Sequence, residues 1–250
     1  HKIESLVSFV SLHDEIFIKK IKSNKHNIIF TGKFARNIGK NNTITKLLEV
    51  LEKKKLLKND KFKIKINKLI PSKAGLGGGS MNASSLLSYF VKKNFFKTSE
   101  KMLKKISKLI GSDVILGLNY TNCVLNEKNE IKRFNNYKKL YVLIVKPNFG
   151  CSTKDIYSKV KKFNKPKFNK PQKKMFDLDY LKKMSNSLEP IALSKYSKLR
   201  TIKLFLENLN TPVFVRMTGS GSVLVAYYRT KKRCENAKKK FNRKYKNYWC

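Results

Sequence analysis

The stretch that decides the fold is Pro71-Ser72-Lys73-Ala74-Gly75-Leu76-Gly77-Gly78-Gly79-Ser80-Met81-Asn82-Ala83. It holds four of the chain's eleven glycines within five positions. Because glycine has no Cβ, backbone N–H groups there can approach an anion closely, and the positive end of a following helix dipole favours negative charge at the same place. The stretch therefore predicts a phosphate-binding loop.

The flanks of this loop predict a strand before it and a helix after it. Apolar and basic residues alternate over 62–66 with the period of a strand, and apolar residues recur at helical spacing downstream, at Ala83, Leu86, Leu87, Phe90 and Val91. A flexible glycine linker is the plain alternative, but linkers rarely have such flanks. The spacing fits neither the Walker loop, which needs Gly-Lys-Ser/Thr at the helix start, nor the dinucleotide fingerprint Gly-x-Gly-x-x-Gly.

Composition bounds the class of protein. With 250 residues, 41% of them hydrophobic, the chain is long enough to bury a core and to form one large domain or two modest ones. No apolar run reaches the length of a membrane span and no signal segment opens the chain, which predicts a soluble cytoplasmic protein. The four cysteines are far apart and include no Cys-x-x-Cys pair, so we expect reduced thiols and neither a zinc site nor a disulfide framework.

The net charge is strongly basic, at +41 from 57 Lys and Arg against 16 Asp and Glu. A nucleic-acid-binding protein concentrates such charge in a patch or stripe. Here lysines occupy strands, helices and loops alike, which favours compositional drift over a dedicated nucleic-acid role. The surplus would still attract anionic substrates. A basic RNA-binding protein remains a less favoured reading.

Periodicity predicts a mixed α+β chain with a domain boundary near residue 138. The stretch 161–174 reads as a surface loop. We expect helical faces at Ile44, Leu47, Leu48 and Leu51, at Met102, Leu103, Ile106, Leu109 and Ile110, and at Leu199, Ile202, Phe205, Leu206 and Leu209, with a final helix over 233–245. We expect strands over 14–21, 27–31, 123–125, 131–134, 140–146, 213–216 and 223–228.

Five ordered segments resemble the GHMP small-molecule kinases, the family of galactokinase, homoserine kinase, mevalonate kinase and phosphomevalonate kinase. The glycine loop 71–83 resembles the family's phosphate loop, and the opening 1–9 is similar to the segment after its Gly-Tyr-His. Gly111-Ser112-Asp113-Val114 resembles its catalytic aspartate turn, and Asn186-Ser187-Leu188-Glu189-Pro190 resembles its Asn-Asp-Leu-Glu motif. Met217-Thr218-Gly219-Ser220-Gly221-Ser222 resembles its second glycine loop. The resemblance implies an α+β, GHMP-kinase two-domain architecture. It comprises a ribosomal-protein-S5-like N-terminal domain over 1–138 and a ferredoxin-like C-terminal domain over 139–250.

The resemblance implies transfer of the γ-phosphoryl group of ATP, with Mg²⁺, to an alcohol. It is greatest to the member of the non-mevalonate isoprenoid pathway that phosphorylates the 2-hydroxyl of a cytidine diphosphate-linked methylerythritol. Homoserine or a mevalonate-type alcohol is the alternative substrate. Asp113 is implied as the catalytic acceptor of the hydroxyl proton. Its sequence position alone favours a turn aspartate that bonds nearby amides.

For ATP, the resemblance implies binding by Pro71, Ser72, Lys73, Ala74, Gly75, Leu76, Gly77, Gly78, Gly79, Ser80 and Met81. Ser80 is the residue expected to assist the phosphates or Mg²⁺, and the alternative is a helix N-cap without a metal contact. Lys73 either adds a phosphate contact or lies in solvent.

For the cytidine substrate, the resemblance implies that His1 reads the cytosine edge and Tyr157 stacks on its ring, with Thr153 close by. Gly219, Ser220 and Gly221 would close over the phosphates and the reacting alcohol, and a hairpin turn is their plain alternative. Asn186, Leu188 and Glu189 would belong to a supporting helix, outside the site itself. Ser187 stands where the family has Asp, which puts any role of that acid in doubt.

The family carries a lysine on a first strand, in Pro-Ala-Lys-Ile-Asn-Leu, before its Gly-Tyr-His. This chain begins at His1. We therefore expect it to lack that strand and the lysine that partners Asp113, as a fragment or an incomplete gene model would, and to be catalytically poor as written. The functional expectation concerns the intact protein, and its oligomeric state is left open.

Overall fold

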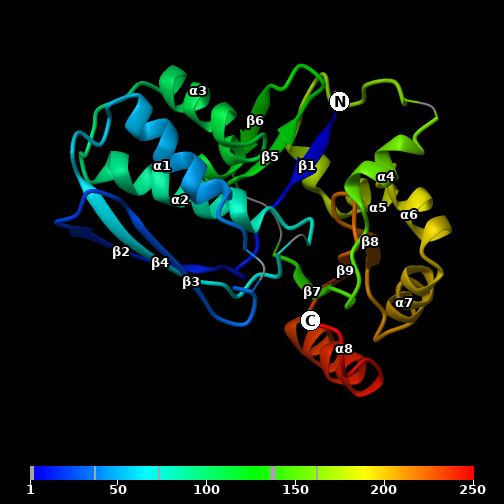
Figure 1. Cartoon of the computed structure of the whole chain (residues 1–250). Coiled ribbons are helices and arrows are strands. Elements are labelled where there is room, and N and C mark those ends of the chain that lie inside the picture. Colours follow the sequence, from blue (N-terminus) through cyan, green and yellow to red (C-terminus); the bar gives the residue numbers. More distant parts are fainter. Residues whose placement is uncertain (1–2, 37, 73, 136–138, 162) are drawn as a thin grey trace. The chain divides into compact units, whose positions relative to one another are not determined.

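The computed structural model describes residues 3–36, 38–72, 74–135, 139–161 and 163–250 (Figure 1). The chain divides into two compact units. The first unit is Ser8–Ser72 with Gly77–Thr121, and the second unit is His1–Val7, Lys73–Leu76 and Asn122–Cys250. The boundary expected near residue 138 stays a prediction, and that residue lies outside the described ones.

The first unit is a three-stranded sheet with helices on one face. The strands β2 (Glu15–Ile21), β4 (Lys61–Asn67) and β3 (Asn27–Thr31) lie in that order, with β2 antiparallel and β3 parallel to β4. Because β3 and β4 are parallel, a crossover must join them, and α1 (Thr43–Lys53) provides it. The unit continues through α2 (Gly78–Lys92), α3 (Glu100–Ile110) and the 3₁₀ helix η1 (Val114–Leu118).

Strand β4 and helix α2 confirm the flanks predicted for the glycine loop. Phe62, Ile64 and Ile66 of β4 point into the core, while Lys63 and Lys65 are exposed on the other face. Helices α1 and α2 cover the apolar face, as Figure 1 shows. The predicted faces of both helices are buried in the same cluster.

The predicted buried face of helix α3 is partly wrong. Ile106 and Ile110 are buried as expected, but Met102 and Leu109 are 38% and 49% exposed. The helix packs on the core along a narrow stripe, and apolar residues beside the stripe stay in solvent.

The second unit holds two further sheets. The strands of one sheet lie in the order β1 (Ser5–Val7), β5 (Asn122–Leu125) and β6 (Ile131–Phe134). The strands of the other lie in the order β7 (Tyr141–Val145), β9 (Leu224–Tyr228) and β8 (Phe214–Met217). All neighbouring strands in both sheets are antiparallel. The longer helices α7 (Ser197–Glu207) and α8 (Lys231–Lys244) share a core with the β7-β9-β8 sheet. The strands predicted around residues 123–145 and 213–228 are confirmed within two residues at each end.

Several short elements of the second unit were not predicted by periodicity. They are β1, α4 (Thr153–Ser158), η2 (Lys173–Phe176), α5 (Leu178–Lys183) and α6 (Glu189–Lys195). The predicted loop over 161–174 has no strand or helix before Lys173 among its described residues. It is nevertheless anchored, because Phe168 is buried beside Val124 and Phe176, and the Glu4 carboxylate accepts bonds from the N–H groups of Lys167 (2.7 Å) and Phe168 (3.0 Å).

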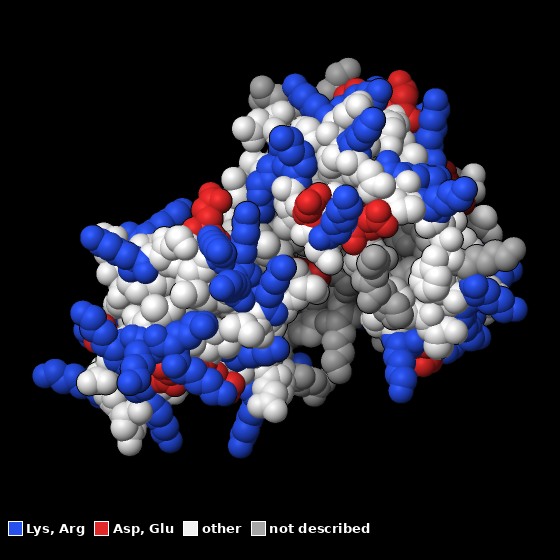
Figure 2. Space-filling model, turned by 90° about the horizontal axis from the view of Figure 1, so that it is seen from above, with Lys and Arg blue, Asp and Glu red and all other residues white. Residues whose placement is uncertain are grey.

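The four cysteines are free in the structure. Burial raises the pKa of the thiols of Cys123, Cys151, Cys234 and Cys250, which keeps them protonated and weakly nucleophilic near neutral pH. Lys and Arg side chains are scattered across the face in Figure 2, among few Asp and Glu. In the described part of the chain, no helix has both the length and the apolar character needed to cross a membrane.

Candidate functional site

The glycine loop ends in a helix start that carries no side-chain cap. The N-cap of α2 is Gly77, whose φ of 68° is left-handed and favours glycine. By contrast, the N-cap side chains of α1, α3 and α8 each accept a hydrogen bond from their own first turn. The alternative that Ser80 is the N-cap of this helix is wrong, because Ser80 lies inside the first turn and Gly77 is the N-cap.

The first turn of α2 is suited to an anion. Its first helical hydrogen bond runs from the N–H of Met81 to the carbonyl of Gly77 (2.9 Å), so the N–H groups of Gly78, Gly79 and Ser80 precede it. No acidic residue lies in this turn. Backbone donors at the positive end of a fifteen-residue helix are the groups that bind phosphates in proteins.

Two glycine segments lie against each other within the second unit. At Gly75, φ is +69°, and an added Cβ would lie 3.2 Å from the carbonyl oxygen of Thr218 and 3.3 Å from that of Gly221. The hydroxyl of Thr218 donates to the carbonyl of Gly75 (3.4 Å). The structure therefore brings the first glycine loop and the second one, at residues 218–222, into backbone contact at this point.

The other loop residues vary in exposure. Pro71 and Ala74 are buried, Leu76 is half-buried, and Ser72, Gly75 and Gly79 are exposed. Lys73 lies outside the described residues, and so does His1.

Asp113 is exposed in the turn between α3 and η1, in the first unit. It occupies the N-cap position of η1, but its side chain makes no cap hydrogen bond. The hydroxyl of Ser112 donates to its Oδ1 (3.0 Å), and no other described residue bonds to this carboxylate. The turn-aspartate alternative, which requires bonds from nearby amides, thus lacks that support.

Gly117 allows η1 to approach α2 closely. A Cβ at this position would lie 2.7 Å from Sδ of Met81 and 3.0 Å from Cβ of Ser84. The absence of a side chain at Gly117 therefore lets the segment after Asp113 pack directly on the first turns of α2.

We expect Gly117→Val to destabilise the first unit by about 1–3 kcal/mol, because the added side chain overpacks the contact with α2. Urea unfolding measures this cost. Gly39→Ala is the matched control, since an added Cβ there meets nothing within 4 Å and should change stability by less than about 0.5 kcal/mol. Equal stability of the two variants would contradict the close packing.

Two of the predicted substrate residues meet in the second unit. The hydroxyls of Thr153 and Ser220 are hydrogen bonded (2.8 Å), so α4 is tied to the second glycine loop. Tyr157 lies one helical turn further along α4 and is half-buried. Ser152 caps this helix by accepting from the N–H of Asp155 (3.3 Å). Thr153, Ser220 and the glycines beside it therefore form one cluster.

The second glycine loop is anchored by residues that the sequence analysis left outside the site. The amide of Asn186 donates to the carbonyls of Met217 (2.9 Å) and Gly219 (2.8 Å). The Glu189 carboxylate accepts from the N–H of Met217 (2.5 Å). These bonds satisfy main-chain groups at the open edge of β8, where no neighbouring strand can. In the sequence, the resemblance of 186–190 to the family's Asn-Asp-Leu-Glu motif pointed to Asn186 and Glu189, but it did not show which groups their side chains bind.

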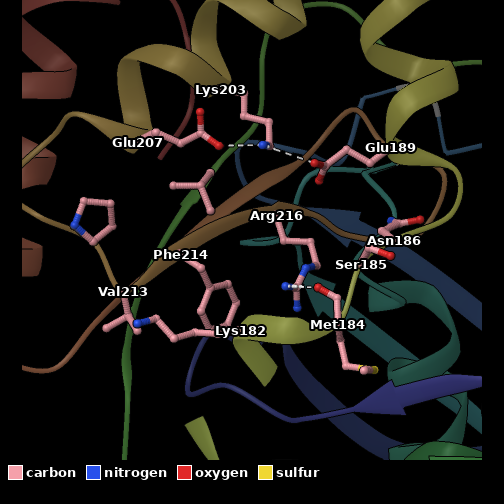
Figure 3. Close-up of a pocket in the computed structure, with 12 residues that line it drawn as sticks. Lys182, Met184, Ser185, Asn186, Glu189, Lys203, Glu207, Val213, Phe214 and Arg216 are labelled. Carbon is pink, nitrogen blue, oxygen red and sulfur yellow. Dashed lines mark hydrogen bonds and ion pairs between the residues drawn. The ribbon is translucent and has the colours of Figure 1, made fainter. Parts of the chain in front are cut away.

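A pocket of about 400 Å³ lies behind these anchors, between β8 and the α5 to α7 region (Figure 3). Apart from Asn186 and Glu189, its wall includes Lys203, Glu207, Phe214 and Arg216. None of the predicted site residues that the structure describes lines it.

Most charged groups of this pocket already have partners within the protein. Lys203 contacts Glu207 (2.5 Å) and Glu189 (3.3 Å), as Figure 3 shows. Burial lowers the pKa of Lys203, but the hydrogen bond and charge of Glu207 and the charge of Glu189 outweigh it and raise the pKa overall. Arg216 donates to the carbonyls of Leu181 (2.9 Å) and Met184, and its guanidinium lies over Phe214. This satisfied arrangement is that of a structural wall which holds Glu189 in place.

Within the described ranges, no group of three or more His, Cys, Asp or Glu side chains is placed to hold a metal ion.

Comparison with known proteins agrees with this geometry. Residues 42–124 match the model of the GHMP kinases N terminal domain. A 4-diphosphocytidyl-2-C-methyl-D-erythritol kinase of Pelagibacter ubique is 52% identical over 250 residues, covering 100% of this chain and 89% of the relative. The enzyme of the same name from Petrotoga mobilis is 35% identical, over 90% of this chain and 88% of its own.

Solved structures agree in fold. A crystal structure of a 4-(cytidine 5'-diphospho)-2C-methyl-D-erythritol kinase matches with a TM-score of 0.76 at 20% identity, over 94% of this chain and 84% of that one. The L. major mevalonate kinase in complex with R-mevalonate matches with a TM-score of 0.73 at 15% identity, over 98% and 88%. The α+β, GHMP-kinase architecture is thereby confirmed. The chain belongs to the GHMP kinase family and, within it, to the 4-diphosphocytidyl-2-C-methyl-D-erythritol kinases.

Proposed function

We propose that this chain transfers the γ-phosphoryl group of ATP to the 2-hydroxyl of 4-diphosphocytidyl-2-C-methyl-D-erythritol, giving the 2-phosphate and ADP in the non-mevalonate route to isoprenoid precursors. The observation that carries the proposal is 52% identity, over the whole chain, to a kinase of that substrate. The uncapped, acid-free start of α2 supports it independently, because this reaction needs a site for a triphosphate.

ATP is assigned to the loop Pro71–Met81. The N–H groups of Gly78, Gly79 and Ser80 would donate to its phosphate oxygens, and the helix dipole of α2 would favour their charge. Phosphoryl transfer asks a protein mainly for positioning and charge neutralisation, and fixed backbone donors supply both without reorganising. The basic surplus of the chain would draw the anionic nucleotide and diphosphate toward the site.

Mg²⁺ would enter with the nucleotide. The hydroxyl of Ser80, in the first turn of α2, is the protein group assigned to it, which fits a cation that keeps most of its coordination from phosphates and water. When bound, it would neutralise part of the charge on the transferred phosphoryl group.

Asp113 is assigned as the acceptor of the proton from the 2-hydroxyl. This carboxylate is exposed, caps no helix and, among the described residues, bonds to Ser112 alone, so it can accept a hydrogen bond from an alcohol. As the oxygen attacks phosphorus, its proton would pass to Asp113 and the product would leave as the phosphate ester.

The cytidine half of the substrate is assigned to the second unit. Tyr157 would stack on the base and His1 would read its edge, while Thr153 and the loop Gly219-Ser220-Gly221 would hold the phosphates and the reacting alcohol. The hydroxyl pair of Thr153 and Ser220 supports a common role for them. The proposal places the reaction in the cytoplasm, with a small-molecule partner and no part for nucleic acid.

The test is which alcohol the full-length protein phosphorylates. ADP release is measured with ATP and Mg²⁺ against three alcohols: 4-diphosphocytidyl-2-C-methyl-D-erythritol, homoserine and mevalonate. We expect kcat/KM for the cytidine substrate to exceed the other two by about 10⁴-fold or more, because a site built for the polar edge of a base discriminates strongly against ligands that lack it. Turnover of homoserine or mevalonate in its place would overturn the assignment.

A further inference from the structure

Asp14, which precedes β2, carries a buried carboxylate that takes no part in the proposed reaction. Its side chain is 0% exposed, and that of its ion-pair partner Lys68 is 5% exposed. Removing two charges from water has a desolvation cost that only close pairing and additional hydrogen bonds offset. The surroundings of Asp14 supply such bonds.

Four donors converge on this carboxylate. Oδ1 accepts from the N–H groups of Leu69 (2.8 Å) and Ile70 (2.9 Å). Oδ2 accepts from the ammonium of Lys68 and from the side-chain amide of Asn82 (2.8 Å). Two donors on each oxygen fill the acceptor capacity of an ionised Asp.

The donors come from both ends of the phosphate loop. Leu69 and Ile70 immediately precede Pro71, and Asn82 immediately follows Met81. One carboxylate in the first unit therefore holds the residues that enter the loop and the helix that leaves it.

The fold builds this link through strand register. Since Glu15 pairs with Asn67 in the antiparallel β2–β4 ladder, Asp14 comes opposite Lys68, where β4 has just ended. The start of α2 is close as well, because a Cβ on Gly78 would lie 3.2 Å from Cγ2 of Ile70. Entry and exit of the loop thus share one rigid support.

We propose that Asp14, with Lys68 and Asn82, is a positioning group that fixes the two ends of the phosphate loop and thereby sets the affinity for ATP. The proposal rests on the assignment of this loop to the nucleotide. Backbone donors work only when they stand close to the required geometry, so loosening either end should weaken ATP binding while leaving the alcohol site unchanged.

Two double variants separate positioning from buried charge. Asp14→Asn with Lys68→Met removes both charges but keeps an oxygen that can accept from Leu69 and Ile70. The tie to Asn82 is kept as well, because the new amide nitrogen can donate to the side-chain oxygen of Asn82 once the Asn82 amide turns over. Asp14→Leu with Lys68→Met removes the charges and the oxygen together. We expect the first to keep KM for ATP within about threefold of the parent, and the second to raise it about tenfold or more with KM for the alcohol nearly unchanged.

A single variant tests the other end of the loop. Asn82→Ala removes the tie to α2 and leaves the ion pair in place, so KM for ATP should rise by about fivefold or more. Asp60→Asn is the matched control, because Asp60 pairs with Lys20 (2.6 Å) before the opposite end of β4. It should leave KM for ATP unchanged.

Each variant is measured by steady-state kinetics with both substrates, by ATP binding in a titration calorimeter, and by its melting temperature. If the parent enzyme is active and both double variants share its KM for ATP, the positioning role is wrong. If the two double variants lose ATP affinity equally, the buried charges matter and the loop bonds do not, which also overturns it. Should the parent bind ATP without turning over any alcohol, the proposed function fails while calorimetry still decides the role of Asp14.

Discussion

Asp113→Asn is expected to lower kcat for phosphoryl transfer by roughly 10²- to 10⁴-fold, the range that a general base contributes. Asparagine keeps the size of the side chain but cannot take up the proton of the attacking hydroxyl. KM for ATP should change little, because the proposed nucleotide contacts lie in the separate loop Pro71–Met81. Stability should also stay within about 0.5 kcal/mol, since the side chain is exposed and caps no helix.

The control for Asp113 is a second exposed acid of the first unit. Glu49→Gln, on α1, removes the same charge from the same unit and should leave kcat unchanged. Single-turnover measurements with bound substrates then assign any loss in Asp113→Asn to the chemical step. Full activity of Asp113→Asn, or an equal loss in Glu49→Gln, would rule out the assigned proton acceptor.

Gly79→Asp is expected to raise KM for ATP by roughly 100-fold. A carboxylate in the first turn of α2 would stand near the proposed phosphate position, and a like-charge pair about 4 Å apart costs about 4 kcal/mol at the effective dielectric of a protein surface, less what solvent screens. The same charge should stabilise the helix itself by about 0.3–1 kcal/mol, because it complements the dipole. Binding and stability are therefore predicted to change in opposite directions.

Gly79→Asn supplies the matched control, with nearly the same shape and no charge. An added Cβ at Gly79 would lie 3.3 Å from Oγ1 of Thr43, so both variants must displace that side chain slightly and to the same extent. Comparing the two in calorimetric ATP titrations and in thermal unfolding isolates the effect of charge. Equal ATP affinity of the Asp and Asn variants would mean that the triphosphate binds elsewhere.

Local patterns were sufficient for the segment that carries the proposed nucleotide site. Alternation over 62–66 and helical spacing after Ala83 predicted β4 and α2, because each pattern is set by which side of one element faces the core. The same reasoning overestimated the buried face of α3. Leu109 satisfies the periodicity but is 49% exposed, since the width of a buried stripe depends on what packs against the helix.

Short elements escaped prediction by periodicity for a related reason. Helices α4 and α6 have six and seven residues, under or about two turns, which is too short for a period to show. They form because each places a fully buried residue in the core of the second unit, Ile156 and Ala192 respectively. Packing rather than intrinsic propensity stabilises helices of this length.

The sequence by itself determined the strand, glycine loop and helix around residues 62–91, the family, and the aspartate turn at Asp113, because these depend on neighbours along the chain. Only the tertiary structure decided that Asp14 meets Lys68 and Asn82, and that Asn186 meets Gly219. Those partners are 54, 68 and 33 residues apart. Strand register and helix packing determine which distant residues meet, and neither produces a short sequence pattern that predicts the pair.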